Sequence, residues 1–219
     1  MKIAVIGATG GSGRAAVEFL LAAGHEVTAF ARTPERVAID HARLRLLAGD
    51  ALSADDVERA IAGQDAVVVT LGITENPLRV RLLGPARTPL DVRSRGTELV
   101  IAAMRRHGVR RLIVQTSYGV GATRERLRFV DRLFFALLLK PQIADTEVQN
   151  RLVSESDLQW TLIHPVHLTD AEDSEMPFAS TSGETARSSL SRRSVGRFLA
   201  RAAESGGFVG QSVALSGAA

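Results

Sequence analysis

Short runs of apolar residues alternate with amphipathic segments along the whole chain. The apolar runs are rich in Val, Ile and Leu, as expected of strands buried on both faces, and occur at 2–6, 25–30, 44–47, 65–70, 110–115, 159–163 and 212–215. The amphipathic segments, with apolar residues three or four positions apart, predict helices at 12–23, 53–60, 91–107, 124–139, 145–155 and 194–203. This alternation predicts an α/β fold with a single Rossmann-type domain over residues 1–219, in which about six to seven strands form a doubly wound parallel sheet with helices on both faces.

Polar residues and glycines mark the ends of the predicted helices. A short polar side chain at the first residue can accept a hydrogen bond from a free backbone N–H of the first turn. The residues expected to cap helices in this way are Ser12, Ser53, Asp91 and Ser194. Gly24 and Gly108 follow two of the helices and are expected to end them.

Two long connections interrupt the alternation and are expected to shape the substrate side of the molecule. Residues 73–90 contain three prolines and cannot form one continuous helix. The arginines of this loop, Arg79, Arg81 and Arg87, suggest an anionic substrate. The second connection is the loop at 168–191, in which residues 170–191 are rich in acidic residues, Ser and Thr and are expected to form an irregular cap or hairpin.

Composition narrows the class of protein. The 219 residues are 45% hydrophobic, which is enough to bury the core of one domain. Segment 124–139 is too short to span a bilayer, so we expect it against the sheet, as a lid or at a subunit interface. Its Arg-rich start leaves docking on a membrane surface as a less favoured alternative. The chain starts directly in a strand and has no Cys, and we therefore expect a cytoplasmic protein without disulfides or thiolate metal sites.

The charge pattern argues for a small anionic ligand. The net charge is +3 and the sequence pI is about 10.1, but the positive charges are scattered among acidic residues. Nearly all of them are arginines, whose planar groups suit small anions, and no basic stripe typical of nucleic-acid binding is present. We expect a small-molecule partner, anionic or aromatic, no nucleic acid and no membrane span, and either a monomer or a homodimer.

The glycine-rich turn after the first predicted strand carries the strongest chemical signal. Residues 7–13 read GATGGSG, between a strand and a helix. Such a turn binds anions, because free backbone N–H groups and the positive end of the helix dipole point to one place. We assign Gly7 to the turn, Gly10 to the close approach of a pyrophosphate and Gly13 to the packing of helix on strand. The spacing is GxxGxxG rather than GxGxxG, but its position in the chain indicates a dinucleotide site.

The end of the second predicted strand selects between NAD and NADP. An acidic residue at this point binds the 2′-hydroxyl of the adenosine ribose, whereas an arginine accommodates a 2′-phosphate. Here the chain has Arg32, with Arg36 four residues later and no acid at the end of the strand. The sequence therefore favours NADP(H). Asp50, Leu71 and Gly72 follow the third and fourth strands, and we expect them beside the adenine and the ribose.

The fifth predicted strand brings candidate catalytic groups to the same edge. It is followed by Thr116, Ser117 and Tyr118, where short-chain dehydrogenases carry a serine that binds the reacting group. The Tyr and Lys pair of those enzymes is missing, because Tyr118 is the only tyrosine and the position four residues later is Ala122. Ordinary alcohol or ketone dehydrogenation by a Tyr and Lys relay is therefore not expected.

The sixth predicted strand ends in HPVH, residues 164–167. His164 and His167 stand on either side of Pro165 and Val166 at the tip of the strand. His167 can donate a proton near neutral pH. A metal site is not expected, since no cluster of acidic residues or cysteines accompanies the two histidines.

Together these segments resemble the atypical short-chain dehydrogenase/reductase group of NAD(P)H-binding, NmrA-like proteins, and within it the flavin reductase/biliverdin reductase B type. The resemblance is carried by GATGGSG, AFARTPER, AGDAL, VVVTLG, RLIVQTS and LQWTLIHPVH. Proteins of that type are NADPH-dependent reductases of flavins and linear tetrapyrroles and are usually monomeric. The resemblance implies catalytic roles for Ser117 and His167, a 2′-phosphate at Arg32 and Arg36, and Asp50 beside the adenine. It implies a pyrophosphate lined by Gly7, Thr9, Gly10, Ser12 and Gly13.

The expected cofactor site combines the strand ends with this resemblance. Its members are Gly7, Thr9, Gly10, Ser12, Gly13, Arg32, Arg36, Asp50, Ala51, Leu71, Gly72, Thr116, Ser117, His164 and Pro165. The chain departs from the family pattern at two places. Many NmrA-like relatives carry Arg-Pro where this chain has His164 and Pro165, and they often carry Lys near Thr146.

Three functions follow from these observations. The first is an NADPH-dependent oxidoreductase that transfers a hydride to a flat, conjugated acceptor such as a flavin, a linear tetrapyrrole or a quinone, for which a dedicated tyrosine acid is dispensable. The second is a non-catalytic, NmrA-like protein that senses NAD(P)(H) and signals to a protein partner. The third, a nucleotide-sugar epimerase or dehydratase, is less favoured because it normally needs the Tyr and Lys pair and a longer substrate domain.

Overall fold

A computed structural model of the chain describes residues 1–73, 88–126, 140–173 and 175–218. Within these residues, eight strands form one sheet in the order β3-β2-β1-β4-β5-β6-β10-β8. The strands are β1 (Lys2–Ile6), β2 (Glu26–Ala31), β3 (Leu44–Ala48), β4 (Ala66–Val69), β5 (Arg111–Gln115), β6 (Gln159–Pro165), β8 (Phe178–Ser180) and β10 (Gln211–Ser216). All neighbouring pairs are parallel except β10 and β8. The predicted doubly wound parallel sheet is confirmed, and an antiparallel edge strand extends it.

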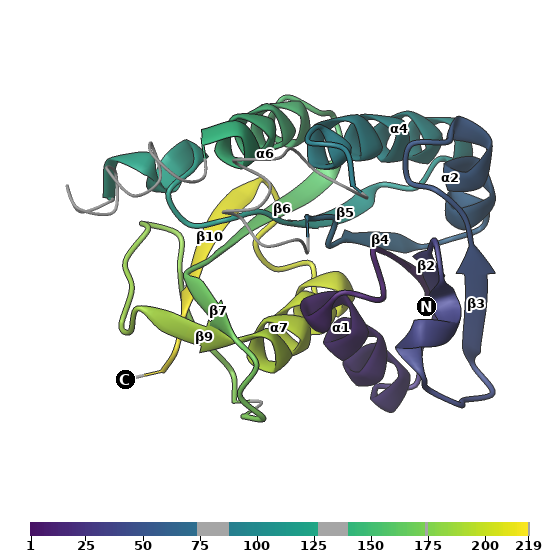
Figure 1. The fold of residues 1–219 in the computed structure, drawn as a ribbon, viewed down its shortest axis with the longest axis horizontal. Helices are drawn as coiled ribbons and strands as arrows, with labels where there is room; N and C mark the ends of the chain where they lie inside the picture. The colour runs from purple at the N-terminus through teal and green to yellow at the C-terminus, as the bar shows by residue number, and fades with distance from the viewer. Residues whose placement is uncertain (74–87, 127–139, 174, 219) are drawn as a thin grey trace.

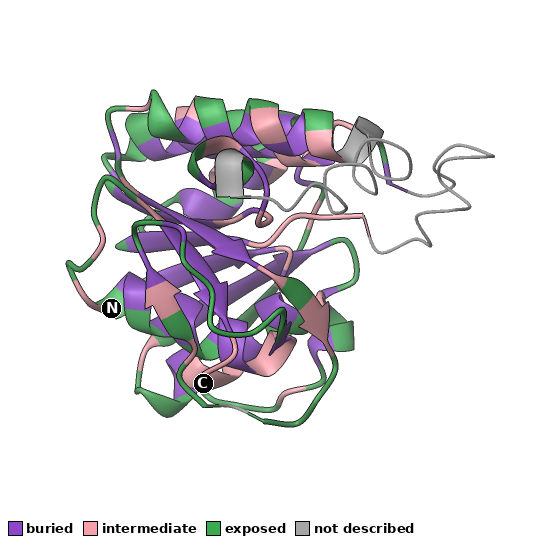
Figure 2. Ribbon diagram, turned by 90° about the vertical axis from the view of Figure 1, so that its left-hand side faces the viewer, coloured by how far each residue is buried: buried purple, intermediate pink, exposed green. Residues whose placement is uncertain are grey.

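Helices cover both faces of the sheet (Figure 1). One layer contains α1 (Gly11–Ala22) and α7 (Arg192–Glu204), and the other contains α2 (Ala54–Ile61), α4 (Val92–His107) and α6 (Lys140–Ser154). Because successive side chains of a strand point to opposite faces, β1 serves both layers: Ile3 packs with Leu20 of α1, whereas Ile6 packs with Val57 of α2. Figure 2 shows the strands buried between the two helical layers.

The segment expected at 168–191 forms short strands rather than a hairpin. β7 (His167–Thr169) and β9 (Ser189–Ser191) pair with each other in parallel, with His167 opposite Ser189. Between them, β8 joins the main sheet beside β10. The hairpin alternative was wrong because the two ends of the segment run in the same direction, which a hairpin cannot provide.

The predicted caps hold for one helix and fail for three. The Oγ of Ser53 accepts a hydrogen bond from the N–H of Asp56 at 3.4 Å, as expected. Helix α1 instead begins after Gly10, so Ser12 lies inside it and is buried. Helix α7 begins at Arg192 and is capped by Ser191, which accepts a hydrogen bond from the N–H of Ser194 at 2.9 Å.

The start of α4 is capped from a distant segment. Asp91 occupies the first position, but its side chain makes no capping hydrogen bond. The carboxylate of Asp145 in α6 caps the helix instead, and accepts the N–H of Arg93 at 3.0 Å and that of Ser94 at 3.1 Å. Sequence spacing alone cannot reveal a cap supplied by a residue more than fifty positions away.

Helix ends are otherwise close to expectation. Gly24 and Gly108 have φ angles of +86° and +69°, as required of glycines that end helices. Helix α6 begins at Lys140, five residues before the predicted start. The predicted helix 124–139 starts in a 3₁₀ turn at Gly121–Arg126, and the rest of it lies outside the described residues, as do Arg79, Arg81 and Arg87.

Two further short elements complete the description. A 3₁₀ turn, η1 (Pro34–Val37), follows β2 and is held by a hydrogen bond of 2.9 Å from Nε of Arg14 to the carbonyl of Val37. Among the described helices, none is both long enough and apolar enough to cross a bilayer.

Candidate active site

The carboxyl ends of the central parallel strands meet at one edge of the sheet (Figure 1). The register aligns Ile6 of β1 with Val69 of β4 and Val69 with Val114 of β5. The glycine turn, the segment after β4 and the segment after β5 therefore leave the sheet side by side. This is the edge at which open α/β sheets bind their ligands.

The glycine turn packs tightly at two of its three glycines. Gly7 has a φ of +90°, and a Cβ there would lie 3.0 Å from the carbonyl of Thr70. A Cβ at Gly13 would lie 2.5 Å from the Gly7 carbonyl oxygen and 2.6 Å from Thr70 Oγ1. These two glycines are needed because helix α1 and strand β4 approach the turn closely, as predicted for Gly7 and Gly13.

Gly10 is different, because the protein leaves room for a side chain there. A Cβ at Gly10 would meet only the Gly7 oxygen, at an ordinary distance of 3.5 Å, and its φ of −73° suits any residue. Among the described residues, no side chain caps α1 and no acid lies in its first turn. The N–H groups at the start of this helix are thus left without a capping side chain among the described residues, which fits an anionic group such as a pyrophosphate.

One residue beside this turn was missed by sequence reasoning. Arg192, the first residue of α7, lies so close to the glycine turn that a Cβ at Gly11 would be 2.5 Å from its Cδ. Its Nη1 is held 2.7 Å from the carboxylate of Asp170. Nothing local in the sequence indicates this position, because it depends on the packing of α7 against α1.

The arginines expected near the adenosine ribose lie after β2. Arg32 is exposed and directly follows the strand, and its Nη2 donates a hydrogen bond of 3.2 Å to Thr88 Oγ1. Arg36 is exposed in η1. Both are at the carboxyl edge, on the far side of β1 from β4.

The residues expected near the adenine form the turn after β3 and the segment after β4. The carboxylate of Asp50 accepts a hydrogen bond of 3.0 Å from the N–H of Leu52, which fixes the turn. Ala51 is buried and Leu71 is half-buried. A Cβ at Gly96 of α4 would meet Leu71 at 2.6 Å and Ala51 at 3.5 Å, so this glycine, which the sequence did not single out, allows α4 to support both segments.

A buried polar group lies under the tips of β5 and β6. Thr116 Oγ1 donates a hydrogen bond of 3.1 Å to the carbonyl of Ile163, and it lies 2.8 Å from Nδ1 of His164. Nδ1 also faces the carbonyl of Ser117, at 3.2 Å, which can only accept, so we assign the ring hydrogen to Nδ1. Nε2 is then an acceptor, buried and without a partner among the described residues.

His164 is neutral near pH 7. Burial lowers its pKa to about 4, and the hydrogen bond with the Ser117 carbonyl opposes this only in part. Its ring is fully buried, so the structure gives it contacts to Thr116 and Ser117 rather than an exposed surface.

The expected catalytic residues, Ser117 and His167, both lie near Pro165, the last residue of β6. Ser117 is half-buried, and the next residue, Tyr118, donates its N–H to the carbonyl of Pro165 at 2.9 Å. The hydroxyl of Tyr118 donates a hydrogen bond of 2.9 Å to the carbonyl of Gly183 and so ties the segment between β8 and β9 to this edge. His167 follows on β7 and is exposed.

Arg93 of α4 is a second residue that sequence reasoning missed. Its guanidinium group lies against Gly72, with Nη2 3.2 Å and Cζ 3.5 Å from the position of a Cβ there. Gly72 follows β4, so this positive charge reaches the carboxyl edge between the glycine turn and Ser117. Burial lowers the pKa of Arg93, and the nearby Asp145 carboxylate opposes the shift.

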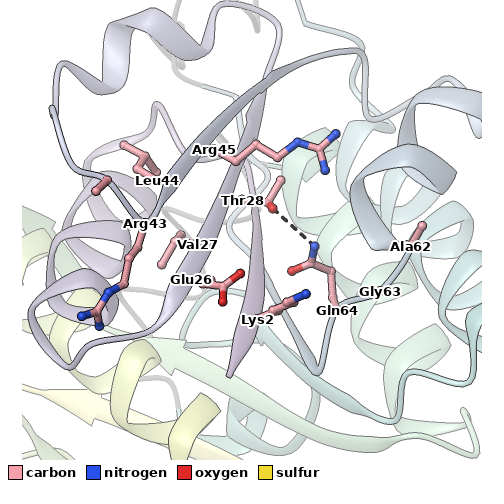
Figure 3. Close-up of a pocket in the computed structure, with 11 residues that line it drawn as sticks. Lys2, Glu26, Val27, Thr28, Arg43, Leu44, Arg45, Ala62, Gly63 and Gln64 are labelled. Carbon is pink, nitrogen blue, oxygen red and sulfur yellow. Dashed lines mark hydrogen bonds between the residues drawn. The ribbon is translucent and has the colours of Figure 1, made fainter.

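A cavity of about 530 Å³ lies at the opposite end of the sheet (Figure 3). Its walls include Lys2 and Glu26 at the starts of two strands, and Gln64 after α2, whose amide donates to Thr28 Oγ1 at 3.3 Å. Because ligands of such sheets bind at the carboxyl ends, this cavity is not the candidate active site. In the described part of the chain, no group of three or more His, Asp or Glu side chains is placed to hold a metal ion.

Comparison with known proteins matches residues 7–205 to the model of a family described as NAD(P)H-binding. A 3-beta-hydroxysteroid dehydrogenase of Mycolicibacterium neoaurum is 31% identical over 126 residues, which are 54% of this chain and 32% of that protein. The chain thus spans about a third of the length of that relative.

Two solved structures share the fold over nearly the whole chain. A short-chain dehydrogenase/reductase of Veillonella parvula, in complex with NADP, has a TM-score of 0.76 and 17% identity, with 98% of this chain and 94% of that chain covered. ChuY, an anaerobillin reductase from Escherichia coli O157:H7, has a TM-score of 0.77 and 19% identity, with 99% and 97% covered.

Proposed function

Because this chain belongs to the NAD(P)H-binding family, we propose that it is an NADPH-dependent reductase that transfers a hydride to a flat, conjugated acceptor such as a flavin, a linear tetrapyrrole or a quinone. The observation that carries the proposal is the start of α1, which no described side chain caps, together with Gly10, where a Cβ would meet only the Gly7 oxygen at 3.5 Å. The packing of the described residues does not require a glycine at position 10. The close approach of a pyrophosphate to this helix end, which attracts anions, would explain why Gly10 is there.

The preference for NADPH over NADH rests on the two exposed arginines after β2. Guanidinium groups bind phosphate with two parallel hydrogen bonds, and Arg32 and Arg36 lie at the strand end where the 2′-phosphate of the cofactor is expected. The NADP complex of the Veillonella parvula structure agrees with this choice. In this account Gly7, Thr9, Ser12 and Gly13 shape the pyrophosphate cradle and the two arginines select the phosphorylated cofactor. The nicotinamide supplies the hydride.

The acceptor class is inferred from the acid that this chain lacks. Tyr118 is its only tyrosine, and the hydroxyl hydrogen of Tyr118 is used on the Gly183 carbonyl. A flat acceptor that stacks on the nicotinamide ring gains most of its rate from positioning, so a tyrosine acid is dispensable. Ser117 then orients the acceptor, and His167, exposed at the tip of the sheet, supplies the proton. The likeness to an anaerobillin reductase supports a tetrapyrrole among the candidates.

The hydrogen bonds of His164 beneath Ser117 support the proposal that Ser117 orients the acceptor. His164 is neutral and donates to Thr116 and to the carbonyl of Ser117, so the backbone at Ser117 is held from below by fixed hydrogen bonds. A held backbone keeps the Ser117 hydroxyl in one place relative to the acceptor, which a reaction controlled by positioning requires.

A second function, a non-catalytic sensor of NAD(P)(H), is favoured by the same missing Tyr and Lys pair. In a sensor, binding of the cofactor would change the interaction of this chain with a protein partner, and Ser117 and His167 would take part in no reaction. An epimerase or dehydratase of nucleotide sugars is disfavoured, because that chemistry normally needs the missing pair.

The deciding experiment compares turnover with cofactor binding. NADPH oxidation is followed by absorbance with FMN, riboflavin, biliverdin and a simple quinone, for the wild type and for Ser117→Ala and His167→Ala. Ser154→Ala and His41→Ala, exposed residues near the opposite edge, are the matched controls. If the protein is a reductase, Ser117→Ala and His167→Ala should lose turnover and still bind NADPH with the wild-type affinity. The two control variants should keep the wild-type turnover. NADPH binding without oxidation of NADPH by any acceptor would favour the sensor.

A further inference from the structure

We propose that Arg93 anchors an anionic group of the acceptor, a carboxylate or a phosphate, at the carboxyl edge of the sheet. The proposal rests on the reductase function above and specifies the chemical class of its substrate. Three observations support it: the position of Arg93 at the sheet edge, the lack of hydrogen-bond partners for its guanidinium group among the described residues, and the presence of other groups for the phosphates of the cofactor.

The position of Arg93 places its charge at the reaction edge. The guanidinium group lies beside Gly72, with Nη2, Cζ and Nη1 at 3.2, 3.5 and 3.9 Å from the position of a Cβ on that glycine. Gly72 is partly exposed and follows β4, which lies between β1, with its glycine turn, and β5, which leads to Ser117. A Cβ at Gly72 would be in tight contact with Nη2, so the guanidinium group packs directly on the backbone of this glycine.

Within the described residues, the guanidinium group of Arg93 has no ion-pair partner, and the Asp145 carboxylate acts on it only through its field. The Nε of Arg93 is buried without a hydrogen-bond partner in the same part of the chain. The nearest acid, Asp145, already accepts hydrogen bonds from the N–H of Arg93, from the N–H of Ser94 and from the Ser94 hydroxyl. A cation in such a place costs free energy unless an anion joins it.

A second buried arginine shows how this protein treats a structural one. Arg111 of β5 is 7% exposed and donates to the carbonyls of Gln159, Ala202 and Gly207 at 2.9, 2.7 and 3.1 Å. Three carbonyls therefore satisfy the two terminal nitrogens of Arg111. The terminal nitrogens of Arg93 have no comparable partners in the described part of the chain, which distinguishes a binding arginine from a structural one.

The anion at Arg93 is assigned to the acceptor because the cofactor's anions are already accommodated. The end of α1 provides N–H groups for a pyrophosphate, and Arg32 with Arg36 provides two guanidinium groups for a 2′-phosphate. Arg93 belongs to α4 and reaches the sheet edge at Gly72, after β4, which neighbours the strand that leads to Ser117. A third anion at this point must come with the molecule that receives the hydride.

The first test uses two acceptors that differ only in their charge. FMN and riboflavin share one ring system, and FMN adds a phosphate. Binding of each to the protein saturated with NADP⁺ is measured by flavin fluorescence. The wild type should bind FMN about tenfold or more tightly than riboflavin, as expected for a charged hydrogen-bonded pair. Arg93→Met should abolish this preference and leave riboflavin binding unchanged, and Arg93→Lys should retain part of it.

The matched control is Arg95→Met, on the same helix, where the arginine is exposed and pairs with Asp91 at 3.5 Å. This variant should keep the full preference for FMN. A preference that survives Arg93→Met, or an equal loss for both flavins, would overturn the proposal. The melting temperature of each variant is measured beside its flavin binding, and Arg93→Lys, which keeps the positive charge near Asp145, serves if Arg93→Met fails to fold.

The second test does not depend on flavins or on turnover. The ¹⁵N–¹H resonance of Arg93 Nε, identified by its loss in Arg93→Lys, is followed while inorganic phosphate or acetate is added to the NADP⁺-saturated protein. A saturable shift supports the anion site, even if no acceptor is reduced and the reductase proposal fails. No shift with either anion overturns the inference while NADPH oxidation can still stand. A shift seen only without NADP⁺ would assign Arg93 to the cofactor's own phosphates, and would also overturn it.

Discussion

Substituting Gly10 by Ala should weaken cofactor binding and leave the fold intact. The added Cβ meets only the Gly7 oxygen, at 3.5 Å, and the φ of −73° is one that alanine adopts freely. The substitution also removes freedom from the unfolded chain, so stability should be unchanged or raised by up to about 1 kcal/mol. The methyl group would occupy the space in front of α1. If a pyrophosphate packs there, overpacking of about 1–3 kcal/mol weakens NADPH binding about 5- to 150-fold.

Gly13→Ala is the contrasting substitution. Its Cβ would lie 2.5 Å from the Gly7 oxygen and 2.6 Å from Thr70 Oγ1, so the protein itself must move to accept it. We expect a loss of about 1–3 kcal/mol in the free energy of unfolding. Urea unfolding gives the stability of each variant, and titration calorimetry gives its NADPH dissociation constant. Wild-type NADPH affinity in Gly10→Ala would refute the account of the glycine turn.

Two further substitutions test the pocket and its support. Arg32→Ala should weaken NADPH binding about tenfold or more and leave NADH binding nearly unchanged, because only NADPH carries the 2′-phosphate; equal losses in the two dissociation constants would contradict the assignment. The pKa of His164 is about 4 in the folded protein and about 6.5 in the unfolded chain. Between these two values the unfolded state binds more protons than the folded state. The free energy of unfolding therefore falls as the pH is lowered from about 6.5 to about 4. His164→Gln should remove this dependence, on the order of 3 kcal/mol in urea unfolding between pH 7 and pH 4, and a variant with the same pH profile as the wild type would show that His164 is not the group involved.

The sheet and its helices could be predicted because their signals are local. The run from Lys2 to Ile6 is apolar enough to identify a buried strand, and Gly24 and Gly108 mark helix ends through a backbone conformation that glycine alone adopts easily. The placement of Gly7 and Gly13 also followed from the sequence, since the turn between strand and helix fixes their neighbours within a few residues.

Features that depend on distant segments could not be predicted. The cap of α4 comes from Asp145, and the arginine beside the glycine turn is Arg192, and each reaches its place only when the helices pack. Arg93 carries no local signal, because it differs from Arg95, two residues later, only in three dimensions: Arg95 pairs with Asp91, whereas Arg93 Nε is buried without a hydrogen-bond partner among the described residues. The parallel pairing of β7 with β9 likewise depends on the long segment between them.

The most direct measurement of the central claim is the rate of hydride transfer itself. Excess protein is mixed with NADPH and either FMN or biliverdin in a stopped-flow instrument, and the loss of NADPH absorbance in a single turnover is compared for NADPH and for NADPH deuterated at both C4 positions. The account predicts that NADPH is consumed in proportion to the acceptor and more slowly when it is deuterated. NADPH that binds but stays unoxidised with every acceptor would contradict it.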